Sequence, residues 1–158
     1  MFETFITVIL WFCAVGCGLM AGVYFAFSGF IMTSFARIET SAGMLAMQSI
    51  NDVILRSVFM PLFFGTSLAA VGVSALGLLD LSRPNALWMA SAGGLYFFGM
   101  FLCTVFFNVP LNNELKEADN HSASGAKVWD RYLRQWTRWN HVRTVVSALS
   151  SILFFASL

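Results

Sequence analysis

The stretch that decides the fold is Thr4–Ala36, which reads TFITVILWFCAVGCGLMAGVYFAFSGFIMTSFA. Its 33 residues carry no charge, and about 20 apolar residues are enough for a helix to cross the roughly 30 Å hydrocarbon core of a bilayer. Two further uncharged blocks are long enough to span alone: 23 residues between Arg56 and Asp80, and 30 residues from Pro84 to Asn113. The sequence therefore predicts at least three transmembrane helices.

The last uncharged block, residues 144–158, is short for a membrane span. Its 15 residues would extend only about 22 Å as a helix. A helix that crosses the bilayer here must include roughly five preceding residues. These place four polar or amphipathic side chains in the membrane or at its boundary: Trp139, Asn140, His141 and Arg143. This shortfall is the first indication that polar groups at that depth have a function.

The composition agrees with a membrane protein. Hydrophobic residues make up 58% of the chain and charged residues 11%, and the mean hydropathy is +0.75. Soluble domains have about 45–50% apolar residues and about 25% charged residues. The net charge of +1 gives no field that would recruit nucleic acid. The three cysteines lie inside apolar runs, so they form no disulfide framework and no redox pair.

We predict an all-α fold: one integral membrane four-helix bundle over residues 1–158, with up-down-up-down topology and helices at about 4–36, 44–79, 84–115 and 128–157. The first helix lacks a basic start, so we expect it to be retained rather than cleaved as a signal peptide. Eight of the nine basic residues lie in the first and third loops and only Arg83 in the second. The positive-inside rule then places both termini outside, and in a bacterium it predicts the cytoplasmic (inner) membrane.

Polar residues gather at the predicted cytoplasmic ends of all four helices, and such groups tend to face a bundle interior or a wet cavity. Asn108 and Asn112 are four residues apart and share a helix face. Gln48 and Asn51 begin the second helix. On the last helix, spacings of three and four residues define two stripes. The inward stripe consists of Trp129, Leu133, Trp136, Asn140, Arg143 and Ser147. The second, outward stripe consists of Arg134, Arg138 and His141. We expect one shared pocket near the inner face.

Each group also has a simpler interpretation. The asparagines would serve as hydrogen-bond glue between helices, worth about 0.6 kcal/mol each. Arg134 and Arg138 would extend to lipid headgroups, and His141 would be an ordinary interfacial residue. On the first helix, Ala14, Gly18, Gly22 and Ala26 form a stripe of small residues that would let another helix approach.

Four segments together resemble a known family. They are GLMAGVYFAFS from Gly18, QSIN from Gln48, FNVPLNN from Phe107 and WDRYLRQWTRWNHVR from Trp129. In order and spacing the chain resembles the small four-helix membrane proteins of the DUF1772 family, which includes the fungal anthrone oxygenases. The resemblance covers nearly the whole chain.

The resemblance implies oxidation of an anthrone to an anthraquinone by molecular oxygen, without an established cofactor. Such chemistry needs a base, donors to an oxyanion and an apolar aromatic pocket. His141 is the candidate base, and Arg143 with Asn140 would stabilise the oxyanion. Trp136 and Trp139, with Phe106 and Phe107, would hold a flat lipophilic aromatic substrate, and Asn51, Asn108, Asn112 and Gln48 would complete the binding site.

Two alternatives stay open at this point. One is a non-enzymatic membrane module that binds a lipid, quinone or haem, or that packs beside a partner protein or a second copy through the Gly18 and Gly22 face. The other is a haem- or metal-dependent oxidase formed between subunits, with His141 supplied by each. No His, Asp or Glu cluster has metal-ligand spacing, so we predict no metal and no cofactor.

Overall fold

The computed structural model describes residues 1–158 and is helical throughout, without strands. A first rod contains α1 (Phe2–Ala26), the π-helical turn η1 (Phe27–Ile31) and α2 (Met32–Phe35). Two separate helices follow, α3 (Thr40–Ile54) and α4 (Phe59–Leu79). A second composite rod contains α5 (Ala86–Tyr96), the π-helical turns η2 (Phe97–Leu102) and η3 (Thr104–Asn108), and α6 (Val109–Glu117). The chain ends with α7 (Ala123–Ala156).

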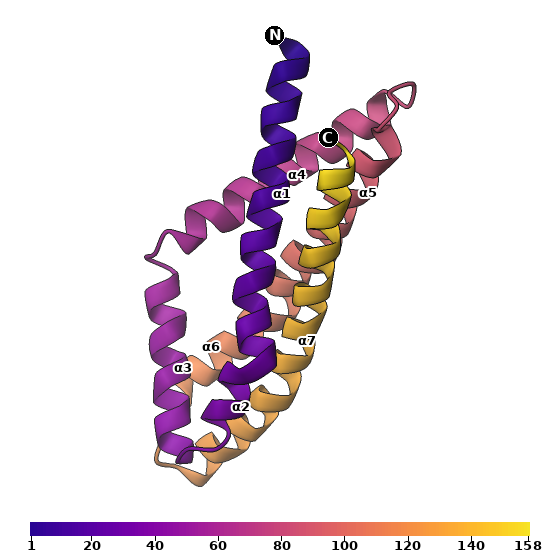
Figure 1. Ribbon diagram of the computed structural model, residues 1–158. Coiled ribbons are helices and arrows are strands. Elements are labelled where there is room, and N and C mark those ends of the chain that lie inside the picture. The colour runs from indigo at the N-terminus through magenta and orange to yellow at the C-terminus, as the bar shows by residue number, and fades with distance from the viewer.

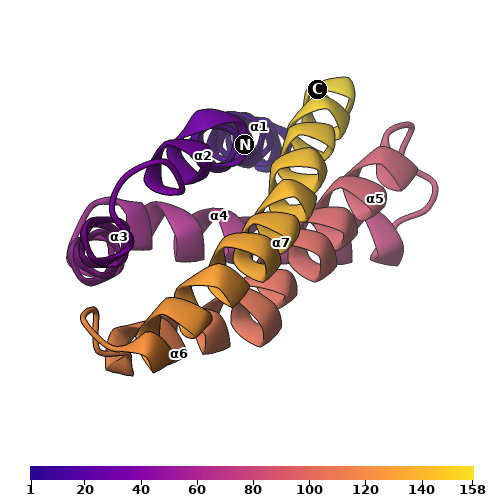
Figure 2. The same cartoon turned by 90° about the horizontal axis from the view of Figure 1, so that it is seen from below.

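The long helix α7 packs against both composite rods. It contacts α1 along one side and α5 along the other, and α4 contacts the same two helices. Figure 2 shows α7 between α1 and α2 on one side and α5 and α6 on the other. The two termini lie at the same end of the molecule, and α3 and α6 lie at the opposite end (Figure 1). Three helical stretches are long and apolar enough to cross a membrane: Phe2–Phe35, Phe59–Leu79 and Ala86–Glu117.

The prediction of a single second helix over residues 44–79 is wrong. The structure has five helical segments in place of four, because the second is interrupted between Ile54 and Phe59. Pro61 explains the break: it has no N–H, and its ring clashes with the carbonyl of Ser57 one turn earlier in a continuous helix. The Ser57 hydroxyl donates to the Ile54 carbonyl at 2.8 Å and accepts from the Phe59 N–H at 3.2 Å. It therefore forms hydrogen bonds with the last residue of α3 and the first residue of α4.

Two buried clusters hold the helices together. The larger one joins α1, α4, α5 and α7 around Met20, Met89 and Tyr96. The smaller one joins α2, α3, α6 and α7 around Met44, Trp129 and Tyr132. The site described below lies where these clusters meet, at the level of the α3–α4 break.

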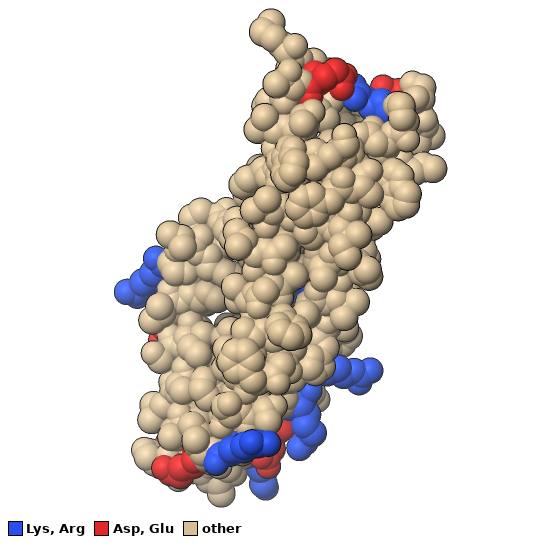
Figure 3. All heavy atoms as spheres, in the orientation of Figure 1, with Lys and Arg blue, Asp and Glu red and all other residues tan.

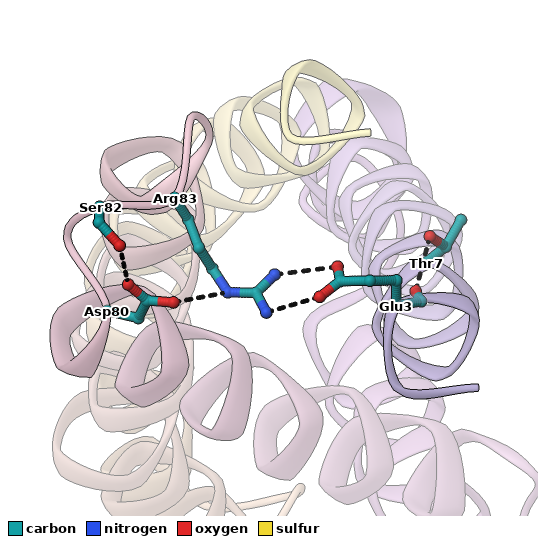
Figure 4. A network of polar contacts seen from close by, with 5 residues as sticks. All are labelled: Glu3, Thr7, Asp80, Ser82 and Arg83. Carbon is teal, nitrogen blue, oxygen red and sulfur yellow. Dashed lines mark hydrogen bonds and ion pairs between the residues drawn. The ribbon is translucent and has the colours of Figure 1, made fainter.

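Charged side chains are concentrated toward the two ends of the molecule (Figure 3), and the buried Arg143 lies between these ends. On the face drawn in Figure 3, most basic side chains lie over the lower half, with acidic side chains beside them at the lower end, and a small acidic and basic group lies at the upper end. That upper group is a network (Figure 4) in which the Arg83 guanidinium donates to both carboxylate oxygens of Glu3 and pairs with Asp80 at 3.2 Å. The Ser82 hydroxyl and the neighbouring Arg83 hold the pKa of Asp80 below its ordinary value. The network ties the start of α1 to the α4–α5 turn.

The contact between α4 and α5 makes our first prediction. A Cβ added at Gly93 would meet the Ala70 carbonyl oxygen and, at 2.7 Å, the Ser74 Cβ, so Gly93→Ala must push the two helices apart. We expect a loss of about 1–3 kcal/mol of stability, measured as a lower Tm of the detergent-purified protein. Gly72→Ala is the matched control, because nothing lies within 4 Å of its added Cβ. Equal melting temperatures for the two variants would contradict this packing.

Candidate functional site

A cavity of about 190 Å³ lies between α1, α3, α4, η3 and α7. Its lining is mostly apolar and rich in aromatic rings, namely Tyr24, Phe27, Phe59, Phe63, Phe64, Phe101 and Trp136. Exposed apolar side chains, among them Leu55, Phe64 and Val105, belong to the same lining and form its rim. Figure 3 shows a small opening at this level, between α1 and α3. An aromatic, lipophilic ligand matches these walls.

All three π-helical turns contribute to the cavity wall, η2 through Phe101. Phe27 belongs to η1, and Thr104 and Val105 belong to η3. Pro110 provides a cause for η3, since it has no N–H to donate to the carbonyl of Phe106, and the Val109 N–H bonds to the Thr104 carbonyl five residues back. Such turns are rare and frequently occur at functional sites, because they change the direction in which side chains point.

Arg143 brings a positive charge to this apolar cavity. It lies on the buried face of α7 and is 5% exposed. Its guanidinium donates to the Asn140 amide oxygen at 2.7 Å and, at 3.4 Å, to the Thr104 hydroxyl. Its carbon lies 4.3 Å from the ring centroid of Tyr24 and 5.1 Å from that of Trp136. The Nε–H has no partner, and no carboxylate pairs with the guanidinium.

Asn140 holds Arg143 in place. Its amide nitrogen donates to the Tyr24 carbonyl and to the Ser28 hydroxyl, both at 2.7 Å. This fixes the orientation of the amide, so its oxygen points to the guanidinium. Asn140 is fully buried and lies outside the cavity lining, and its contacts are those of a positioning residue.

The other predicted amide side chains divide into two groups. Asn51 and Asn112 line the cavity; the Asn51 amide nitrogen has no partner, and the Asn112 oxygen accepts from the Tyr132 hydroxyl at 2.8 Å. Asn108 and Gln48 lie outside the lining. Asn108 donates to the Trp136 carbonyl at 3.3 Å, and Gln48 donates to the Leu115 and Ala118 carbonyls at 2.8 and 3.3 Å, where α6 ends.

The structure does not bring His141 or Trp139 to the cavity. His141 is exposed on the outer face of α7, as are Arg134 and Arg138. Trp139 stacks on Phe107 with ring centroids 3.8 Å apart, and both rings, like Phe106, lie outside the lining. The predicted stripes on the last helix are nevertheless confirmed: Trp129, Trp136, Asn140, Arg143 and Ser147 are buried.

Sequence reasoning missed most of the aromatic wall. Phe59, Phe63 and Phe64 come from the start of α4, and Phe101 comes from η2. Phe59 and Phe63 stand four residues apart just after the predicted cytoplasmic segment, and this spacing puts both rings on one helix face. The positions of Tyr24 and Phe27 depend on η1, which no simple periodicity predicts.

The donor set of the cavity does not suit a metal or haem. No His, Cys, Asp or Glu side chain lines it, and the chain has no group of three or more such residues that could hold a metal ion. Neutral amides, one phenol and one guanidinium are poor ligands for transition metals. The cavity instead offers hydrogen-bond donors and aromatic surface.

The family model described as anthrone oxygenase matches residues 47–153, which cover α7 as far as Leu153 and all the cavity-lining residues from Met47 onward. No curated protein and no solved structure matches the chain.

Removing the buried charge provides a stability test. An unpaired charge in an apolar interior is costly, and replacement of even a buried ion pair by apolar side chains of similar size is often neutral or stabilising by about 1–4 kcal/mol. We therefore expect Arg143→Met to melt at the same temperature as the unaltered protein or higher. Arg138→Met is the control, since it changes an exposed arginine on the same helix and should alter stability by less than about 0.5 kcal/mol. A clear loss of Tm in Arg143→Met alone would make Arg143 a structural residue.

Proposed function

Because the chain belongs to the anthrone oxygenase family, we propose that this membrane protein is an oxygenase that oxidises a flat, lipophilic anthrone- or phenol-like substrate with O2 in the cavity beside Arg143. The observation that carries the proposal is a single unpaired guanidinium in an otherwise apolar, aromatic cavity. Aromatic walls suit a polycyclic substrate, and the guanidinium suits an oxygen that becomes negative during the reaction.

The chemistry makes use of the acidity of an anthrone. Loss of a proton from its methylene carbon gives a delocalised anion with the charge on the carbonyl oxygen. This anion transfers electrons to O2 and forms a carbon–oxygen bond at the former methylene carbon. Cleavage of the O–O bond then leaves a second carbonyl, so one oxygen atom enters the anthraquinone and the other leaves as water. The protein must stabilise the first anion and exclude competing reactions.

Arg143 is the proposed catalytic residue in this scheme. Its free Nε–H and its remaining donors are placed to hold the anionic oxygen, while Asn140 fixes its orientation. Asn51 and Asn112 would position polar substituents of the substrate. His141 lies outside the cavity, so we assign it no role in proton transfer.

The reaction as proposed needs no cofactor, because the substrate anion itself supplies the electrons to O2. The lack of metal-ligating side chains in the cavity supports this proposal. A haem or metal shared by the exposed His141 residues of two copies is the competing arrangement, and an absorption spectrum with metal analysis of the purified protein distinguishes the two.

For the membrane, we propose four spans, with α7 as the fourth from about Trp139 to Ala156. These 18 residues would extend about 27 Å as a helix, and they include one charge, that of Arg143. The lower end of the molecule, with its excess of basic side chains, would then face the cytoplasm, and both termini would face the other side. The cavity would lie near the cytoplasmic boundary, in the inner membrane of a bacterium.

The second candidate function is a non-enzymatic membrane module. It is favoured by the open surface at Gly22, where an added Cβ would meet nothing within 4 Å, so that a second copy or a partner helix could approach there. Gly22→Leu would then disrupt an oligomer that gel filtration detects, and an unchanged elution volume would count against this interface.

Oxygen uptake tests the proposed function. The purified protein should consume O2 in the presence of anthrone and form anthraquinone, and Arg143→Gln should lower kcat/KM by about 10²–10³-fold, the usual effect of losing one oxyanion donor. Arg138→Gln should match the unaltered protein. If Arg143→Gln keeps full activity while anthrone is turned over, the cavity is not the active site.

His141 provides an independent check. Because it is exposed and outside the cavity lining, we expect His141→Ala to retain oxygen uptake with an unchanged pH profile. A large loss of kcat in this variant would return the role of the base to His141 and require a substrate site on the outer face of α7.

A further inference from the structure

The chain contains no counter-charge for Arg143. Of its eight carboxylates, Glu3 and Asp80 pair with Arg83, Asp52 pairs with Lys116, and Glu114 pairs with Arg131. The remaining four, Glu39, Glu117, Asp119 and Asp130, are exposed. None of these carboxylates contacts the guanidinium. Arg143 is only 5% exposed, and it therefore keeps its positive charge buried and unpaired.

The groups that face Arg143 are neutral on every side. Tyr24 faces it from α1, Thr104 from η3, and Trp136 and Asn140 from its own helix. Cys103 and Tyr132 are the other titratable groups close enough to interact, and thiols and phenols are uncharged at neutral pH. An anion that enters the cavity would therefore meet a single positive charge and no competing negative one.

The cavity also lacks a base. Tyr24 and Arg143 are the only titratable side chains in its lining, and neither accepts a proton at neutral pH. A general base that would remove the proton of a bound substrate is thus missing from the walls. Ionisation of the ligand must come from stabilisation of its anion, with the proton leaving to solvent.

From these observations we propose that the cavity binds its ligand as a monoanion: the deprotonated oxygen of a lipophilic phenol or enol pairs with Arg143, and one proton per ligand is released to solvent. The class of ligand rests on the proposed function, whereas the requirement for a single negative charge does not. In atom and charge balance, a neutral phenol, the protein and one water molecule give the phenolate–protein complex and one hydronium ion. The bound phenol is consequently a stronger acid than the free one.

The test uses 2-naphthol, whose phenolate absorbs at longer wavelength than the neutral molecule, and its methyl ether, which has the same ring system but no acidic proton. At a pH well below that at which free 2-naphthol ionises, the full-length protein in detergent should give the phenolate spectrum. It should bind 2-naphthol about 10- to 100-fold more tightly than the ether, the range expected for a charge-assisted hydrogen bond. Calorimetry in two buffers of different ionisation enthalpy should report about one proton released per ligand.

Three variants locate the effect. Arg143→Gln should lose the phenolate spectrum and the preference over the ether, Arg143→Lys should retain part of both, and Arg138→Gln should behave as the unaltered protein. Gel filtration and thermal unfolding establish that each variant is folded. Binding of 2-naphthol in its neutral form, or equal binding of the ether, would overturn the proposal even if anthrone is oxidised.

A lipid phosphate could provide the same anionic oxygen, so nanodiscs with and without phosphatidylglycerol form the last arm. We expect 2-naphthol to bind equally in both. Displacement of the probe by phosphatidylglycerol, dependent on Arg143, would reassign the site to a lipid headgroup and overturn the phenol assignment. Formation of the phenolate complex without oxygen uptake would instead contradict the oxygenase and leave the anion site standing.

Discussion

The buried guanidinium of Arg143 is the interaction on which the rest of the site depends. An unpaired charge at this depth is costly, and the structure surrounds it with two aromatic faces, an oriented amide and a hydroxyl rather than a carboxylate. A carboxylate would neutralise the charge and remove its use to a ligand. The arrangement keeps the guanidinium fixed and its charge available, which is what stabilisation of an anion requires.

The architecture around the site follows from interruptions in the helices. Pro61 separates α3 from α4, and Pro110 accompanies the π-helical turn η3; both interruptions border the cavity. Above this level the larger buried cluster packs α1, α4, α5 and α7 closely, with Gly93 against α4. Below it, α3 and α6 meet the first half of α7 in the smaller cluster. The cavity lies where the packing changes from one arrangement to the other.

Much of this was predictable from the sequence, and the parts that were not have physical reasons. Uncharged length predicts the apolar spans, and spacings of three and four place Asn140 and Arg143 on the inner face of the last helix. The break at residues 55–58 falls inside the predicted second helix of residues 44–79, since sequence does not show whether a proline such as Pro61 bends a helix or ends it. Part of the aromatic wall depends on π-helical turns, which contribute Phe27 and Phe101 and which no simple periodicity predicts. His141 is a candidate base by its chemistry alone, whereas its stripe faces outward.

The most direct test of the central claim is an experimental structure of the protein in a lipid environment with an anthrone-type ligand, such as its anthraquinone product. The account predicts density for a flat ring system between Phe63 and Trp136, with one ligand oxygen within hydrogen-bond distance of the Arg143 guanidinium. A ligand bound on the outer face of α7 beside His141, with the cavity empty, would contradict it.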